Sequence, residues 1–176
     1  EQWGLYSNNT NQTVQWSLIG PANSFSYHSK GIHGFGIMFG KGQNSWHHNM
    51  VAHNISRNFR GKVEGTSVMD FVNNVVYDWG YQTAYGTLGH LNYANNYFKA
   101  GSSTSGGYNY INFSSGSNVE KYKFYLTGNK MINKDGTVRN SETENWKAVN
   151  YGSVTSTYGY GESYYRTDSY MPLYTN

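Results

Sequence analysis

The sequence predicts an all-β fold, a parallel β-helix in which short strands stack coil upon coil. Two observations predict it: a composition poor in charge and rich in turn-forming residues, and an Asn that recurs every two dozen residues or so. Of 176 residues, 13% are charged and 18% aromatic, with 21 Gly and 18 Tyr. Globular chains usually carry about 25% charged residues. Uncharged Tyr, Asn, Ser, Thr and Gly must therefore keep this surface in water, and these residues favour strands and turns over helices.

The repeat consists of a short strand, a polar bend at an Asn, and a second short strand. Four copies share the Asn at the same place: Asn49, Asn74, Asn96 and Asn129. The intervals between them are 25, 22 and 33 residues, and the longest contains a Gly/Ser-rich insert over residues 101–107. A weaker copy earlier in the chain has Ser17 in place of the Asn. Repeats of this length are typical of solenoids.

The Asn itself suits a bend of a β-helix for two reasons. Asn tolerates the left-handed backbone conformation that a tight bend requires, and stacked Asn side chains can bond to one another as an internal ladder. The alternative is an antiparallel sandwich in which the Asn residues mark hairpin turns. Hairpins favour Asn-Gly, whereas Val, Tyr or Met follows the Asn pairs here.

The two ends of the chain differ in composition. Residues 1–140 hold the predicted coils, and the first strand is expected by Thr13. A solenoid needs a polar cap on its stacked core, and none precedes that strand, so we expect the β-helix to be incomplete at its N-terminal end. Residues 141–176 are rich in Tyr, Gly and Ser. They are expected to form an extended tail whose rings pack on the outside of the coils.

Several classes of protein are excluded by composition. The sequence contains no run of about 18 apolar residues, the length that could span a bilayer. It also contains no Cys, so neither a disulfide nor a thiolate metal site can form. The Lys and Arg residues are scattered, so neither nucleic acid nor a membrane is expected as a partner. No close pair of carboxylates supports a glycosidase. A transition-metal site is not expected at His47, His48 and His53, because adjacent strand residues face opposite ways.

Cations gather at two places along the chain. Arg57, Arg60 and Lys62 lie within six positions. Arg60 and Lys62 share a face at strand spacing, and Arg57 lies on the opposite face unless the bend turns it. Such a cluster could hold a carboxylate, although a solvated surface is the commoner role of a basic loop.

The second place lies around Lys30. His28 or His33 could point at a ligand together with Lys30, and the neighbouring glycines would let that ligand approach the backbone. The alternative for this segment is a simple solenoid bend with small residues.

Four stretches, taken in order, resemble the second half of the pectate lyases of polysaccharide lyase family 1: residues 13–19, 28–36, 46–60 and 70–80. The resemblance covers roughly residues 1–140. It implies a right-handed, single-stranded parallel β-helix and a secreted or extracellular enzyme, which could also be periplasmic or at the cell surface. The implied reaction is cleavage of polygalacturonate, the acidic polysaccharide of pectin, by β-elimination with Ca²⁺.

The resemblance also implies roles for individual residues. Arg57 matches the catalytic Arg that opens the family's Arg-x-Pro-x-x-Arg motif, and Lys62 matches its last, substrate-binding position. Lys30 matches a substrate-binding Lys upstream, and Arg60 and His33 are expected to help bind the substrate. Removal of the C5 proton builds negative charge on the neighbouring carboxylate, so cations stabilise the transition state more than the ground state. An arginine is an unusual base, because its side-chain pKa normally lies above about 12.

Two departures from the family pattern are visible. Phe59 occupies the position of the motif's Pro. The family's principal calcium ligands precede the point where this chain begins, and Glu1 alone falls near an acidic position of that region. A second chain supplying the N-terminal coils is therefore an expected partner. Two alternatives stay open: a solenoid that binds acidic polysaccharide without cleaving it, and a calcium-independent pectin lyase.

Overall fold

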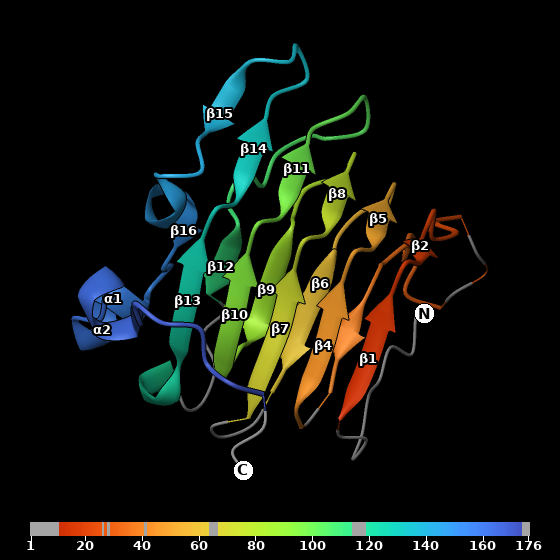
Figure 1. Cartoon of the computed structure of the whole chain (residues 1–176). Coiled ribbons are helices and arrows are strands. Elements are labelled where there is room, and N and C mark those ends of the chain that lie inside the picture. Colours follow the sequence, from red (N-terminus) through yellow and green to blue (C-terminus); the bar gives the residue numbers. More distant parts are fainter. Residues whose placement is uncertain are drawn as a thin grey trace.

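The structure is a computed structural model that describes residues 11–25, 27, 29–40, 42–63, 67–113 and 119–173. Within these residues the chain winds through five stacked coils, each of which gives one strand to each of three sheets (Figure 1). Strands that are neighbours in a sheet pair in parallel, apart from the antiparallel pair β14 and β15. The predicted all-β parallel β-helix is confirmed.

Each sheet is named here by the place of its strands in a coil. Sheet 1 contains, in spatial order, β1 (Gln12–Gln15), β4 (Asn44–His47), β7 (Val68–Val72), β10 (His90–Ala94) and β13 (Lys123–Thr127). Sheet 2 contains β2 (Leu18–Ile19), β5 (Met50–Ala52), β8 (Val75–Tyr77), β11 (Tyr97–Lys99), β14 (Lys130–Ile132) and β15 (Val138–Asn140). Sheet 3 contains β3 (Met38–Phe39), β6 (Phe59–Lys62), β9 (Ala84–Thr87), β12 (Ile111–Phe113) and β16 (Val149–Asn150).

A ladder of buried Asn side chains joins the coils at the bend between sheets 1 and 2. The Asn74 side-chain oxygen accepts from the backbone N–H and the amide of Asn49, at 3.0 and 3.1 Å. The same pair of bonds links Asn74 to Asn96 and Asn96 to Asn129. Each amide also donates to a strand carbonyl of the preceding coil, as Asn74 does to Trp46 at 2.9 Å. The predicted ladder is present, and it satisfies backbone groups that would otherwise be buried without partners.

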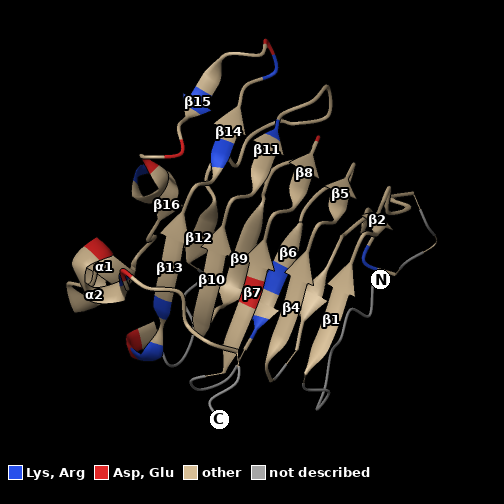
Figure 2. Ribbon diagram, viewed as in Figure 1, with Lys and Arg blue, Asp and Glu red and all other residues tan. Residues whose placement is uncertain are grey.

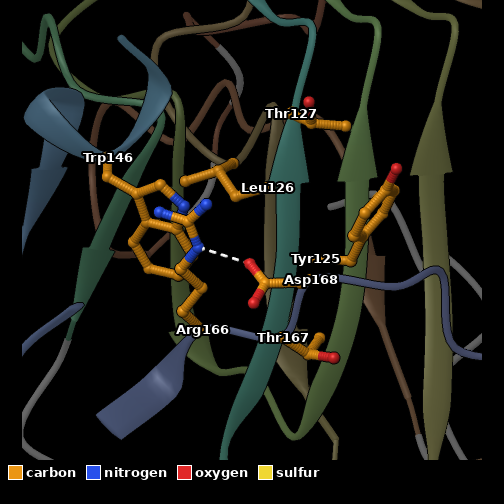
Figure 3. Close-up of a pocket in the computed structure, with 7 residues that line it drawn as sticks. All are labelled: Tyr125, Leu126, Thr127, Trp146, Arg166, Thr167 and Asp168. Atoms are coloured by element: carbon orange, nitrogen blue, oxygen red, sulfur yellow. Dashed lines mark hydrogen bonds and ion pairs between the residues drawn. The ribbon is translucent and has the colours of Figure 1, made fainter. Parts of the chain in front are cut away.

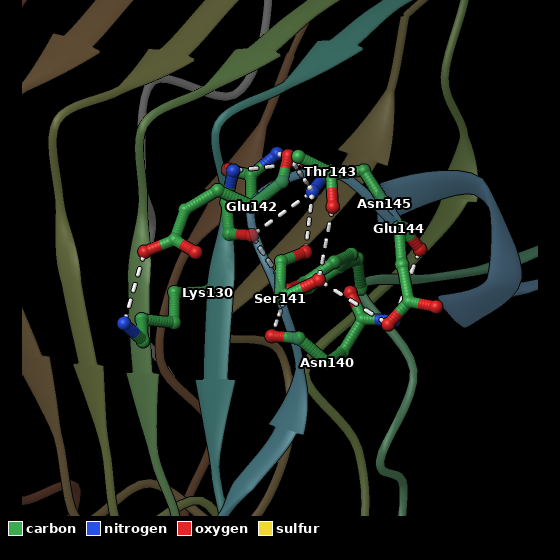
Figure 4. A network of polar contacts seen from close by, with 9 residues as sticks. Lys130, Asn140, Ser141, Glu142, Thr143, Glu144 and Asn145 are labelled. Atoms are coloured by element: carbon green, nitrogen blue, oxygen red, sulfur yellow. Dashed lines mark hydrogen bonds and ion pairs between the residues drawn. The ribbon is translucent and has the colours of Figure 1, made fainter.

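Asn145 ends the ladder. Its side-chain oxygen accepts from the Asn129 amide at 2.7 Å, and its own amide donates to the Ser141 and Glu142 carbonyls at 3.2 and 2.9 Å (Figure 4). An ion pair between Lys130 and Glu142 fixes the same loop at 3.0 Å. Asn145 and β16 both lie beyond residue 140, so the ladder and sheet 3 continue past the point where the sequence predicted a tail.

The left-handed residue of each bend is not the ladder Asn, as the sequence had suggested, but the residue before it. Positive φ angles near 55° occur at Trp16, His48, Asn73 and Asn95, and Gly128 has 65°. The left-handed residue turns the chain, and the next residue can then aim its side chain into the interior. Asn is needed at the second position for its hydrogen bonds, while the first position accepts several residue types.

The core between the sheets is mostly aromatic. Phe59 lies 4.9 Å from Phe39 and 5.0 Å from Phe71 between ring centroids, and Phe71 stacks on Tyr93 at 5.4 Å. All four rings are buried. Contacts between rings of successive coils extend the core along the stack and fix the strand register.

The C-terminal segment is helical in part and not simply an extended tail. The 3-10 helix η1 (Val119–Lys121) precedes the last coil, and three further elements surround its end: η2 (Asn145–Ala148), α1 (Val154–Tyr158) and α2 (Glu162–Tyr165). The two α-helices lie at the end of the stack, and the chain then crosses the outer face of sheet 1 (Figure 1). Tyr165 is buried against Phe113 and Phe124. Among the described helices, none has the length and apolar character to cross a bilayer.

Candidate active site

The outer face of sheet 3 brings the predicted cations together. In β6, Phe59 and Gly61 face the core, whereas Arg60 is half-buried and Lys62 is exposed on the outside. Arg60 pairs in register with Tyr85 of the next coil, and Lys62 pairs with Thr87. Strand alternation thus places Arg60 and Lys62 on one face, as their spacing predicts.

Arg57 joins this face because the chain bends at its own position. Its φ angle is 55°, in the left-handed region. The Nε–H of Arg57 donates to the Tyr85 hydroxyl at 3.1 Å, and its guanidinium carbon lies 4.2 Å from the centre of the Phe35 ring. The bend therefore turns Arg57 toward the Arg60 side. Two aromatic side chains hold its guanidinium, which leaves its terminal N–H groups without a hydrogen bond to any described residue.

Arg60 is oriented by the same tyrosine. Its guanidinium carbon lies 5.3 Å from the centre of the Tyr85 ring. The Arg60 Nε is buried and has no hydrogen-bond partner among the described residues. A buried cationic donor without a partner is costly, and a carboxylate bound at this place would satisfy it.

The other predicted substrate-binding residues lie at different distances from this centre. His33 contacts Phe35 edge-on, with ring centroids 4.2 Å apart, on the strand segment that bridges to Ser56. Lys30 lies in an exposed turn three residues before His33. The roles of Lys30, Lys62 and His33 stay predictions. His28 lies outside the described residues.

Phe59, in the place of the motif's Pro, is an anchor for the bend. Its ring is buried among the core aromatics, while the backbone N–H of Asn58 donates to Thr83 O at 2.9 Å. The Asn58 amide donates to Gln82 O at 3.1 Å. Burial of Phe59 and the bonds of Asn58 fix the residues that follow Arg57, so the bend does not depend on a proline.

The charge on this face has one sign. Of the described strands of sheet 3, only β6 contains Lys or Arg, and none contains Asp or Glu (Figure 2). Cations on a surface without acidic neighbours attract an anionic ligand.

Calcium ligands are not gathered among the described residues. No group of three or more His, Asp or Glu side chains lies close enough there to hold a metal ion. Glu1, the predicted ligand, lies outside the described part of the chain. Binding of calcium stays a prediction.

Asp78, which is buried, has partners other than a metal. Its Oδ2 lies 2.9 Å from His53 Nδ1, and its Oδ1 accepts from the Ser103 N–H at 2.7 Å. Burial alone would raise the pKa of Asp78, but these hydrogen bonds outweigh it and lower the pKa below its ordinary value. The carboxylate is held in place as an anion.

His47 and His48 do not face opposite ways, as strand alternation had suggested. The left-handed φ of His48, 56°, brings the two Nδ1 atoms to 2.8 Å. The ring of His48 also stacks on Trp16, with centroids 4.6 Å apart. The expectation of opposed side chains was wrong because His48 is a bend residue and not part of the strand.

Phe35 and Tyr85 are site residues that the sequence reasoning missed. Tyr85 follows Arg60 by 25 residues, the same interval that separates Asn49 from Asn74. That interval carries one residue to its neighbour in the next coil, so extending it from the ladder to the cations would have found Tyr85. Phe35 carried no comparable signal, since its pairing with Ser56 depends on a loop of irregular length.

Comparison with known proteins found one similar sequence, while no protein-family profile matches the chain. A protein of Aspergillus flavus named probable pectate lyase C is 34% identical over 169 residues, which cover 91% of this chain and 36% of the relative. The chain is thus similar in sequence to a probable pectate lyase. A match over 91% of the chain includes its central part, where the cationic face lies. The chain spans about a third of the length of that curated relative.

Proposed function

We propose that this chain carries the substrate-binding face and the base of a lyase that cleaves polygalacturonate by β-elimination. The observation that supports the proposal most directly is the arrangement of Arg57. Phe35 and Tyr85 hold its guanidinium beside Arg60, on a sheet face whose described strands contain no carboxylate. The similarity to a probable pectate lyase C supports the same class of reaction.

The cations of β6 would bind uronate carboxylates. Arg60 has an unpaired buried Nε, and Lys62 lies two residues along on the same face. Lys30 and His33 would extend this binding beyond the strand. Negative charge that develops on the carboxylate during the reaction strengthens its interaction with these cations, which lowers the barrier more than it strengthens ground-state binding.

Arg57, with its guanidine in the deprotonated form, would take the proton from C5 of the bound uronate. The C5–H electron pair forms the C4=C5 double bond, the C4–O bond breaks, and the leaving glycosyl oxygen takes a proton from water. The product has an unsaturated uronate at its new end. The hydrogen bond from Nε to Tyr85 and the Phe35 ring restrict the orientation of the guanidinium.

Calcium assistance is part of the proposal, with ligands from outside the described residues. The ion would supply positive charge next to the substrate carboxylate. A further N-terminal segment, supplied by a second chain or by the same one, would complete the site. A secreted or extracellular protein, whether periplasmic or at the cell surface, fits a polysaccharide substrate of this size.

The test is substitution of Arg57 by Ala in the complete protein, with polygalacturonate and calcium present. We expect formation of unsaturated uronates, followed by ultraviolet absorbance, to be abolished while polygalacturonate still binds. Arg139→Ala is the matched control, because Arg139 also stacks on an aromatic ring, with its guanidinium carbon 4.3 Å from the Tyr108 ring centre. Full activity of the Arg57 variant would refute the assignment.

A second candidate function is binding of acidic polysaccharide without cleavage. The absence of three grouped metal-ligating side chains among the described residues favours it. Saturable binding of polygalacturonate, with no unsaturated product in the presence of calcium and all other chains, would select this function. A chelator separates the third alternative, since a pectin lyase would keep its activity on methylated substrate without calcium.

A further inference from the structure

A cavity of about 150 Å³ lies at the edge of sheet 1, well away from the cations of sheet 3. It is enclosed by β13, by Trp146 of η2 and by the segment 166–168 that leaves α2 (Figure 3). A cavity of that volume holds roughly one six-membered ring. The first question is why the chain leaves it open.

The cavity exists because the last strand of sheet 1 is only partly covered. Lys123 and Thr127 direct backbone groups toward β10, as the bonds Lys123 N–H to Gly89 O and Asn95 N–H to Thr127 O show. The backbone N–H and C=O groups of the alternate residues, Phe124 and Leu126, therefore point toward the free edge of the sheet. The Thr167 N–H donates to Phe124 O at 2.9 Å, and the chain then departs from the strand. No described residue outside the sheet bonds to the backbone of Leu126.

The walls of the cavity combine one aromatic surface with several polar groups. Trp146 is half-buried and supplies a large apolar ring. The Arg166 guanidinium donates from Nε to Asp168 at 2.7 Å, and Figure 3 shows this ion pair beside the strand. Thr127 and Thr167 add hydroxyl groups. One aromatic face with convergent polar groups and free backbone groups suits a ligand that is apolar on one side and rich in hydroxyls at its rim.

Charge decides which ring-sized ligand fits best. Arg166 is paired with Glu162 at 2.8 Å as well as with Asp168, so one cation lies between two anions. The cation that lines the cavity is therefore already paired with carboxylates, which disfavours a further carboxylate there. This is the opposite of the cationic face on sheet 3, and a uronate is therefore not the expected ligand.

We propose that this cavity binds a single neutral pyranose unit, whose C–H face packs on Trp146 and whose hydroxyls bond to the Leu126 backbone and to the Arg166–Asp168 pair. Such a site would engage neutral sugar branches or ends of a polysaccharide. The proposal does not rest on the lyase function, since no residue of the sheet 3 face takes part.

The test is a titration of the whole chain with methyl galactopyranoside, followed by the NMR signal of the Trp146 indole N–H. A ligand of this size in a shallow polar site is expected to bind with a dissociation constant on the order of 1 mM. Galacturonic acid, which has the same ring with a carboxylate, should bind about tenfold more weakly. Absence of a saturable change with methyl galactopyranoside, or equal binding of the two sugars, would overturn the proposal.

Two variants and a control locate the binding. Trp146→Ala should weaken binding at least about tenfold. Trp16→Ala, which removes an indole that is 75% exposed and remote from the cavity, should leave it unchanged. Because Trp146 packs on the core, Asp168→Asn on the exposed segment serves as an independent variant. It removes a negative charge from the lining, so it should shift the ratio of the two affinities toward galacturonic acid. Retained binding in the Trp146 variant, or an unchanged ratio of affinities in the Asp168 variant, would show that the cavity is not the site.

Discussion

Tyr85 links the two arginines of the candidate active site. Its hydroxyl accepts the Nε–H of Arg57, and its ring supports the guanidinium of Arg60. Tyr85 is best regarded as a positioning residue, because it acts on the reaction through the orientation of Arg57.

Tyr85→Phe tests this role. The ring and its contact with Arg60 are retained, while the hydrogen bond to Arg57 is lost. A hydrogen bond to a charged group contributes about 1.5–3 kcal/mol, so kcat should fall about tenfold or more with little change in KM.

Tyr81→Phe is the control for that measurement, because Tyr81 is 50% exposed and outside the site. A Tyr85 variant that kept the wild-type kcat, or that lost activity only through a higher KM, would contradict the positioning role.

At the scale of elements, the Asn ladder determines how the coils stack. Asn74 accepts two hydrogen bonds from Asn49 and donates to Trp46 O and to Asn96. Every one of these groups is buried, so none can turn to water if Asn74 is removed.

Asn74→Ala should therefore destabilise the whole stack. It leaves the Asn49 N–H and the Trp46 carbonyl without partners, at about 1–3 kcal/mol for each unsatisfied group. We expect a loss of about 3 kcal/mol, which in a chain of this length lowers the unfolding midpoint by roughly 10 °C. Urea and thermal unfolding would measure it. Asn150→Ala, at an exposed Asn, is the control and should change the free energy of unfolding by less than about 0.5 kcal/mol. Equal losses in the two variants would contradict a stabilising role of the ladder.

The ladder was predictable from the sequence because it repeats, whereas the C-terminal elements were not. Recurring Asn residues revealed both the coil and the partner of each side chain. The helices α1 and α2 have five and four residues, too short for an amphipathic period to be visible. The common face of Arg60 and Lys62 was predictable too, because strand alternation places them on one side. The contact between Phe35 and Arg57 was not predictable, because it depends on how a loop folds back.

At the scale of the whole molecule, the C-terminal segment ties the end of the stack to its middle. After α2, the chain crosses sheet 1 as far as β7, where the Tyr170 hydroxyl donates to the Asp70 carboxylate. The Met171 N–H donates to the Asn92 side-chain oxygen at 2.9 Å. Asp70 also accepts from the Asn92 amide at 2.7 Å and is buried. One carboxylate thus joins the last segment of the chain to two central strands.

Asp70 makes this attachment sensitive to pH. Burial raises the pKa of Asp70 above its ordinary value of 3.8, although the hydrogen bonds from Tyr170, Asn92 and Ser45 and the charge of His47 oppose the shift. A carboxyl group with a raised pKa favours the folded state when protonated. Its contribution to the free energy of unfolding is fully present when the pH is below the ordinary pKa. That contribution is lost as the pH rises through the folded-state pKa. Asp78 has the opposite shift, so its contribution is lost only as the pH falls below that ordinary value.

Two substitutions should change this pH dependence in opposite directions. Asp70→Asn removes the titrating group, so the fall in the free energy of unfolding between about pH 4 and pH 8 should become smaller. Tyr170→Phe removes a donor that favours the carboxylate, which raises the pKa of Asp70 further and should make the fall larger. Urea unfolding at a series of pH values measures both effects. Tyr158→Phe, at a tyrosine that is 55% exposed, controls for loss of a hydroxyl. Parallel stability curves for the Asp70 and Tyr170 variants would exclude the carboxylate as the pH-sensitive attachment of the C-terminal segment.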